Sequence, residues 1–99
     1  MKVELLYFDG CPNWEATDLA LREALRRSGR SHATVDRVRV ETPEQAEALR
    51  FVGSPTVLID GRDPFCAGEE KVGLACRVFP TPAGLAGSPT VEQLIGALS

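Results

Sequence analysis

Apolar residues crowd the first stretch of the chain, where residues 3–8 carry no charged position apart from Glu4. A strand that is apolar on both faces is typical of a sheet interior covered on both sides. Residues 34–40 alternate apolar and polar positions, which predicts a second strand nearer a sheet edge. A β-rich apolar run follows Pro55 and ends at the Asp60-Gly61 turn, which predicts a third strand.

Helical spacing appears in three places. Residues 12–28 predict a helix that ends at Gly29, and its apolar face carries Trp14, Thr17, Ala20, Leu21, Ala24, Leu25 and Ser28. The sequence Thr42-Pro43-Glu44-Gln45 is a capping box, so we expect a short helix from there to about Arg50. A last helix is expected over residues 89–98, with Ser88 as its cap.

The remaining segments hold two of the three cysteines. Residues 60–73 predict a turn, a short strand and a loop that carries Cys66, and residues 74–79 predict a last strand that carries Cys76. Prolines and glycines over residues 80–87 predict a loop before the final helix. The predicted order is βαβα-ββα, a single α/β domain over residues 1–99 with a central mixed sheet flanked by helices.

Composition narrows the class of protein. With 99 residues, 43% hydrophobic and 25% charged, the chain has the make-up of one soluble domain. A net charge of −3 and a pI near 5.1 give no reason to expect nucleic acid. No apolar run approaches the roughly 20 residues of a membrane span, and no signal peptide is visible. An odd number of cysteines excludes a full disulfide framework, so we expect a cytoplasmic protein. We also expect a monomer or a weak dimer.

Cys11 lies where the first strand gives way to the first helix. If Cys11 is the N-cap and Pro12 is N1, the N–H groups of Asn13 and Trp14 point back at the sulfur. A helix N-terminus favours negative charge, so a thiol held there ionises more easily than its reference pKa of about 8.5 implies. Cys11 is therefore the predicted nucleophile.

Other interpretations of this turn stay open. Asp9 and Glu15 are close in sequence and oppose a thiolate, so only moderate activation is expected. A lone cysteine at a tight turn also serves as a small apolar filler. Trp14 is either a binding surface beside the sulfur or a core aromatic that anchors the helix.

Cys66 and Cys76 have three possible roles. They can pair with each other, one of them can resolve a mixed disulfide on Cys11, or both can be buried fillers. Cys76, inside a predicted strand, suits the filler role better than Cys66 in its loop. No Cys-x-x-Cys spacing or histidine pair is present, so neither a metal site nor a cofactor is expected.

The motif Cys11-Pro12-Asn13-Trp14 after a strand, together with Ser54-Pro55 before a strand, resembles the thioredoxin-like superfamily. Its nucleophilic cysteine opens the first helix, and Trp14 stands here where the usual second cysteine would be. In that superfamily a cis-proline faces the nucleophile, and the residue before it offers backbone groups to a bound peptide or thiol. The resemblance implies that Pro12, Asn13, Trp14, Ser54 and Pro55 contact the substrate.

The resemblance also implies a function: monothiol redox chemistry in which Cys11 attacks a small thiol adduct or a protein disulfide. The opening Asp-Gly-Cys-Pro-Asn-Trp and the Gly-Ser-Pro-Thr of residues 53–56 are similar to those of small bacterial thioredoxin-like proteins sometimes labelled alkylmercury lyase-like. That similarity implies a second function, organomercurial or metal-thiolate handling by Cys11 with Cys66 or Cys76. A third is a non-catalytic thioredoxin-fold binding module.

Overall fold

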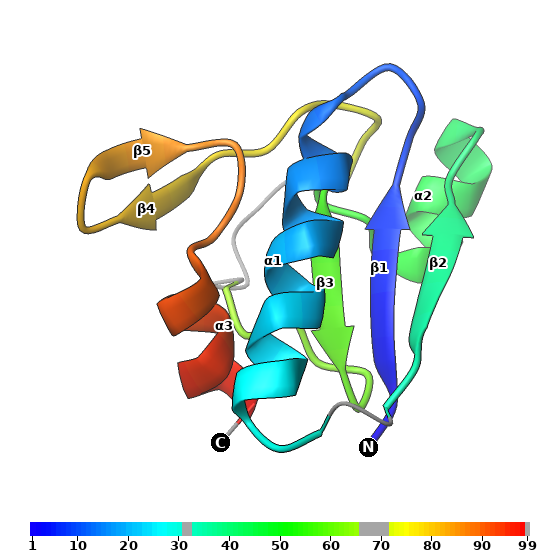
Figure 1. Ribbon diagram of the computed structural model, residues 1–99. Helices are drawn as coiled ribbons and strands as arrows, with labels where there is room; N and C mark the ends of the chain where they lie inside the picture. Colours follow the sequence, from blue (N-terminus) through cyan, green and yellow to red (C-terminus); the bar gives the residue numbers. More distant parts are fainter. Residues whose placement is uncertain (31–32, 66–71, 99) are drawn as a thin grey trace.

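The protein is a mixed α/β structure in which helices cover a three-stranded sheet (Figure 1). The computed structural model describes residues 1–30, 33–65 and 72–98. Its elements in order are β1 (Val3–Tyr7), α1 (Asn13–Arg27), β2 (Val35–Arg39), α2 (Pro43–Leu49), β3 (Thr56–Ile59), β4 (Phe79–Thr81), β5 (Gly84–Ala86) and α3 (Val91–Leu98). No helix in the described ranges is long and apolar enough to cross a bilayer.

The strand β1 occupies the middle of the sheet, as its apolar sequence predicts. The strand order is β2-β1-β3, with β2 parallel and β3 antiparallel to β1. The edge position predicted for β2 is confirmed. Its mixed sequence fits there, because Val35 and Val38 pack against the two cores while Asp36, Arg37 and Arg39 remain exposed.

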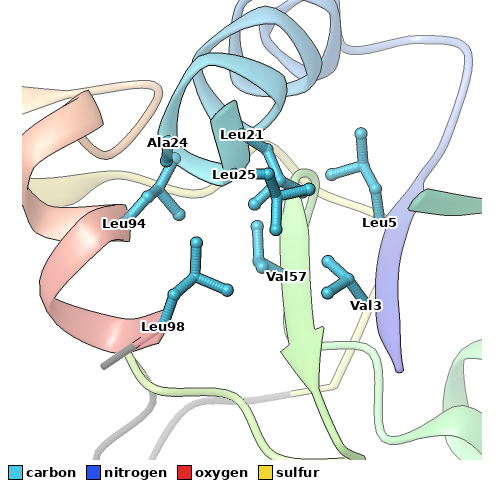
Figure 2. Close-up of a cluster of buried hydrophobic side chains, with 8 residues drawn as sticks. All are labelled: Val3, Leu5, Leu21, Ala24, Leu25, Val57, Leu94 and Leu98. Carbon is cyan, nitrogen blue, oxygen red and sulfur yellow. The ribbon is translucent and has the colours of Figure 1, made fainter. Parts of the chain in front are cut away.

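The two faces of β1 enter two separate cores. Val3 and Leu5 point to the side covered by α1 and α3, where they belong to one buried cluster with Leu21 and Leu94 (Figure 2). The whole cluster is Val3, Leu5, Leu21, Ala24, Leu25, Val57, Leu94 and Leu98. Leu6 points to the opposite side, where it packs with Val40, Ala46, Phe51 and the helix α2. Burial on both sides fixes the register of β1, because a slip by one residue would exchange the two faces.

The segment after β3 differs from the prediction. Residues 74–78 do not form a strand but make a single parallel bridge, Ser54↔Cys76, and Phe79 begins β4. The following residues, predicted as a loop, form the β4–β5 hairpin, which stands away from the main sheet (Figure 1). Pro80 is tolerated in β4 because a two-stranded ribbon leaves one edge of each strand unpaired. Gly84 has a φ of 111°, a conformation that favours glycine.

The helix α3 begins two residues later than predicted. Thr90 Oγ1 accepts a hydrogen bond from the Gln93 N–H at 3.1 Å, and Gln93 Oε1 accepts one from the Thr90 N–H at 2.9 Å. This reciprocal pair is a capping box, the same device that starts α2 at Thr42. Ser88, the predicted cap, instead accepts a hydrogen bond from Thr17 of α1 at 2.8 Å.

Removing the α3 cap should therefore weaken the fold measurably. We expect Thr90→Ala to lower the free energy of unfolding by about 1 kcal/mol, because the Gln93 N–H loses its partner. Urea unfolding measures the change. Thr34→Ala, at an exposed position, is the control and should change stability by about 0.5 kcal/mol or less. Equal effects of the two substitutions would contradict this assignment of the cap.

Candidate active site

Cys11 sits in the turn at the end of β1. Its N–H donates to the Phe8 carbonyl at 3.2 Å, which closes the turn. Gly10 lets the Phe8 ring lie close to this turn, because a Cβ there would stand 2.5 Å from the ring and the ring would have to move. The Cys11 side chain is fully buried, and its Sγ donates to the Ser54 carbonyl at 3.5 Å. The thiol therefore faces the entry to β3.

The start of α1 lies one residue later than predicted. Pro12 is the N-cap residue, with φ −75° and ψ −9°, and the helix begins at Asn13. No side-chain hydrogen bond caps this end among the described residues, so the prediction of Cys11 as the N-cap is wrong. The first turn closes at Pro12, whose carbonyl accepts the Glu15 N–H at 3.3 Å, and the Cys11 thiol donates to the Ser54 carbonyl instead of capping the helix. Cys11 is left outside the helix, and its thiol bonds Ser54.

Ser54 is the point where three segments meet. Its peptide bond to Pro55 is cis, and both residues are buried. The Ser54 N–H donates to the Ala75 carbonyl at 2.8 Å, and the Ser54 carbonyl accepts the Arg77 N–H at 2.9 Å. The yellow segment before β4 thus passes over the starts of α1 and β3 (Figure 1). Ala75 and Arg77 therefore bond the Ser54 N–H and carbonyl, the backbone groups that the resemblance to thioredoxin-like proteins assigns to a substrate.

Cys76 lies beside Cys11. A hydrogen bond with the Cys11 thiol raises the pKa of Cys76 above its ordinary value, and partial desolvation adds to the shift. Cys76 is exposed, so its interpretation as a buried filler is wrong. The structure therefore brings together two free cysteines that are far apart in the sequence. Cys66 lies outside the described residues.

A buried ion pair holds the Cys76 segment in place. Arg77 Nη1 lies 2.6 Å from Asp63 Oδ2, and the side chains of both residues are largely buried. The Arg77 guanidinium also lies over the Phe79 ring, 4.5 Å from its centroid. Gly53 lets the segment come close, since a Cβ there would stand 3.0 Å from the Arg77 Cβ. Arg77 and Asp63 were not predicted as site residues, because no local pattern links a loop aspartate to a distant arginine.

The other residues implied by the resemblance have structural contacts. Pro12 is exposed, and Asn13 packs against Gly87, where a Cβ would collide with its side chain. The Trp14 ring stacks on Tyr7 of β1 with centroids 4.3 Å apart, and Arg37 lies 5.8 Å from the Trp14 ring centroid. These contacts favour the interpretation of Trp14 as the aromatic that anchors α1 to the sheet.

Two hollows help to define the surroundings of the site. The larger, of about 860 Å³, opens beside α2 and β3, and neither Cys11 nor Cys76 lines it. A smaller one, of about 230 Å³, lies between Gly10 and Leu74 and includes the Asp9–Arg39 ion pair. Over residues 1–30, 33–65 and 72–98, no three metal-ligating side chains cluster together. Among the described residues, the Cys11–Cys76 pair is therefore the grouping on which the functional interpretation rests.

No protein-family model matches the chain, and no curated protein or solved structure is significantly similar to it. Function is therefore inferred from the geometry and chemistry of the site.

Proposed function

We propose that this is a thiol–disulfide redox protein with a thioredoxin-like arrangement, in which Cys11 and Cys76 form the redox pair. The observation that carries the proposal is that both cysteines lie at Ser54, whose carbonyl accepts a hydrogen bond from Cys11 Sγ at 3.5 Å and whose backbone forms a bridge with Cys76. The motif Cys11-Pro12-Asn13-Trp14 predicts a monothiol, since it lacks a neighbouring second cysteine. Cys76 supplies that second thiol from a distant part of the chain.

The arrangement of the elements supports the same proposal. Cys11 follows the central strand β1 and precedes α1, and Ser54-Pro55 leads into β3, which pairs antiparallel with β1. This is the arrangement that the resemblance to thioredoxin-like proteins implies for a nucleophile and its facing proline. The contact between Cys11 Sγ and the Ser54 carbonyl brings these two motifs together.

The proposed reaction exchanges one disulfide for another. The reduced pair gives two electrons to a substrate disulfide, the Cys11–Cys76 bond forms, and the substrate sulfur–sulfur bond breaks. Each substrate sulfur leaves as a thiolate and takes up one of the two protons released by the pair. A small thiol disulfide or an exposed protein disulfide is the matching substrate class.

Peptide mapping after oxidation tests the pair directly. Trypsin cleaves after Lys2, Arg22, Arg62, Lys71 and Arg77, so each cysteine falls in a different peptide. After treatment with glutathione disulfide and acid quenching, we expect the peptide of residues 3–22 cross-linked to that of residues 72–77. Cys66→Ser is the control and should give the same cross-link. A wild-type protein that forms no Cys11–Cys76 cross-link would contradict the proposal and favour a non-catalytic binding module.

Metal-thiolate handling is the second candidate, and the same placement of both cysteines at Ser54 favours it. Two adjacent sulfurs suit a soft, thiophilic ion such as mercuric ion. If the pair binds mercuric ion, one equivalent should protect both Cys11 and Cys76 from alkylation, and Cys76→Ser should weaken that protection. Release of the hydrocarbon from an organomercurial by purified protein would extend the proposal from binding to cleavage.

A further inference from the structure

The two thiols differ completely in their access to solvent. Cys11 has 0% of its surface exposed, whereas Cys76 is an exposed residue. Disulfide exchange requires a substrate sulfur to come into contact with the protein sulfur along the axis of the bond that forms or breaks. Of these two described thiols, only Cys76 can make that contact with a molecule in solution.

The segment that covers Cys11 is firmly attached. Its backbone is bonded on both sides of Cys76, through the Ala75 carbonyl and the Arg77 N–H, to the two backbone groups of Ser54. The buried Arg77–Asp63 ion pair adds an anchor, and releasing it would leave buried charges without partners. An incoming strand therefore finds Ser54 already occupied, and Cys11 is not uncovered without breaking these bonds.

We propose that substrates bond covalently to Cys76 and that Cys11 is the internal thiol, which reverses the roles that the helix-start motif predicts. The inference rests on the proposed redox function and adds to it the identity of the substrate-facing sulfur. Because the covering segment stays in place, the matching substrates are small disulfides and thiols, or protein disulfides that project from a surface.

The reaction consists of two successive disulfide exchanges and can run in either direction. Cys76 thiolate attacks one sulfur of a substrate disulfide, the first substrate thiolate leaves, and a mixed disulfide remains on Cys76. Cys11 thiolate then attacks the Cys76 sulfur, the second substrate thiolate leaves, and two electrons have passed to the substrate. In the reverse direction a substrate thiolate attacks the exposed Cys76 sulfur, Cys11 leaves as a thiolate, and a mixed disulfide forms on Cys76. A second substrate thiolate then attacks the substrate sulfur of that bond, Cys76 leaves as a thiolate, and the substrate disulfide is released.

Access to the two sulfurs agrees with this order. A substrate sulfur can approach the exposed Cys76 but not the buried Cys11. The interaction with the Cys11 thiol raises the pKa of Cys76, which lowers its thiolate fraction in the reduced protein. The trapping experiment therefore uses excess disulfide.

Trapping with glutathione disulfide identifies the substrate-facing sulfur. We compare Cys11→Ser with Cys76→Ser, both in a Cys66→Ser background, and follow the glutathione adduct by intact mass. Serine at position 76 keeps the covering segment at nearly its native size, so Cys11 stays buried in that variant. We expect Cys76 to form the adduct at least about tenfold faster than Cys11 does. Urea unfolding of both variants checks that each is folded.

The outcomes separate this inference from the proposed function. If the wild-type protein forms the internal cross-link but Cys11 captures glutathione faster than Cys76, the redox function stands and the reversed roles are wrong. If the wild-type protein forms no internal cross-link, the redox function fails, and the role assigned to Cys11 fails with it. Fast capture on Cys76 together with the cross-link supports both.

Discussion

Oxidation of the Cys11–Cys76 pair is expected to raise the free energy of unfolding by about 4 kcal/mol. The bond would close a loop of about two thirds of the chain, and cross-linking a loop of that length removes much conformational freedom from the unfolded state. Both cysteines already lie at Ser54 in the folded state, so little native rearrangement opposes the gain. Urea unfolding of the oxidised and the dithiothreitol-reduced protein measures the difference.

The control for this experiment is Cys76→Ser, whose unfolding curves should coincide under oxidising and reducing conditions. A wild-type protein that carries the mapped cross-link but gains no stability would contradict the expected fit of the sulfurs. The same difference in free energy also applies to disulfide formation. If the disulfide stabilises the folded state by a given amount, folding favours formation of the disulfide by that same amount. About 4 kcal/mol corresponds to roughly a thousandfold preference for the oxidised pair in the folded chain over the unfolded chain.

Local patterns account for the parts of the fold that were predicted correctly. The interior position of β1 follows from apolar residues on both of its faces, and the edge position of β2 follows from its alternating sequence. The start of α2 follows from Thr42 and Gln45, which satisfy each other's backbone groups without help from the rest of the chain. In each case, residues close in sequence supply the deciding interactions.

The misplaced boundaries arise where two local signals compete. Ser88-Pro89 and Thr90 with Gln93 are both acceptable starts for α3, and the sequence alone does not rank them. The hydrogen bond from Thr17 to Ser88 uses the serine hydroxyl elsewhere, so the helix begins after Thr90. A contact between distant segments therefore decides the boundary, and no local pattern contains it.

In the candidate site, too, the features decided by residues close in sequence were predicted, and those decided by distant contacts were not. Cys11 and Ser54-Pro55 were singled out from their motifs, and the hydrogen bond from Cys11 to Ser54 brings the two together. The partnership with Cys76 stayed open between Cys66 and Cys76, because it depends on where the segment of residues 75–77 crosses Ser54. That crossing is fixed by Arg77 and Asp63, whose pairing depends on tertiary structure alone.

Breaking the Arg77–Asp63 pair should have the largest effect of any single substitution considered. We expect Asp63→Ala to lower the free energy of unfolding by about 3–5 kcal/mol, because it leaves the buried Arg77 charge without its carboxylate. Asp63 Oδ1 also accepts the Phe65 N–H at 2.9 Å, so Asp63→Asn, which can keep that turn bond, should cost less. Asp36→Ala, at an exposed position of β2, is the control and should cost about 0.5 kcal/mol or less.

A second substitution shows whether the loss of stability comes from the unpaired Arg77 charge or from the other interactions of Asp63. If the unpaired Arg77 charge causes the loss, Asp63→Ala combined with Arg77→Met should recover most of it, because an apolar side chain needs no partner. The single variant should also alkylate at Cys11 faster than the wild-type protein, since the segment over Cys11 loses its anchor. A double variant as unstable as Asp63→Ala, with Cys11 still protected, would show that the backbone bonds at Ser54 hold the segment without the ion pair.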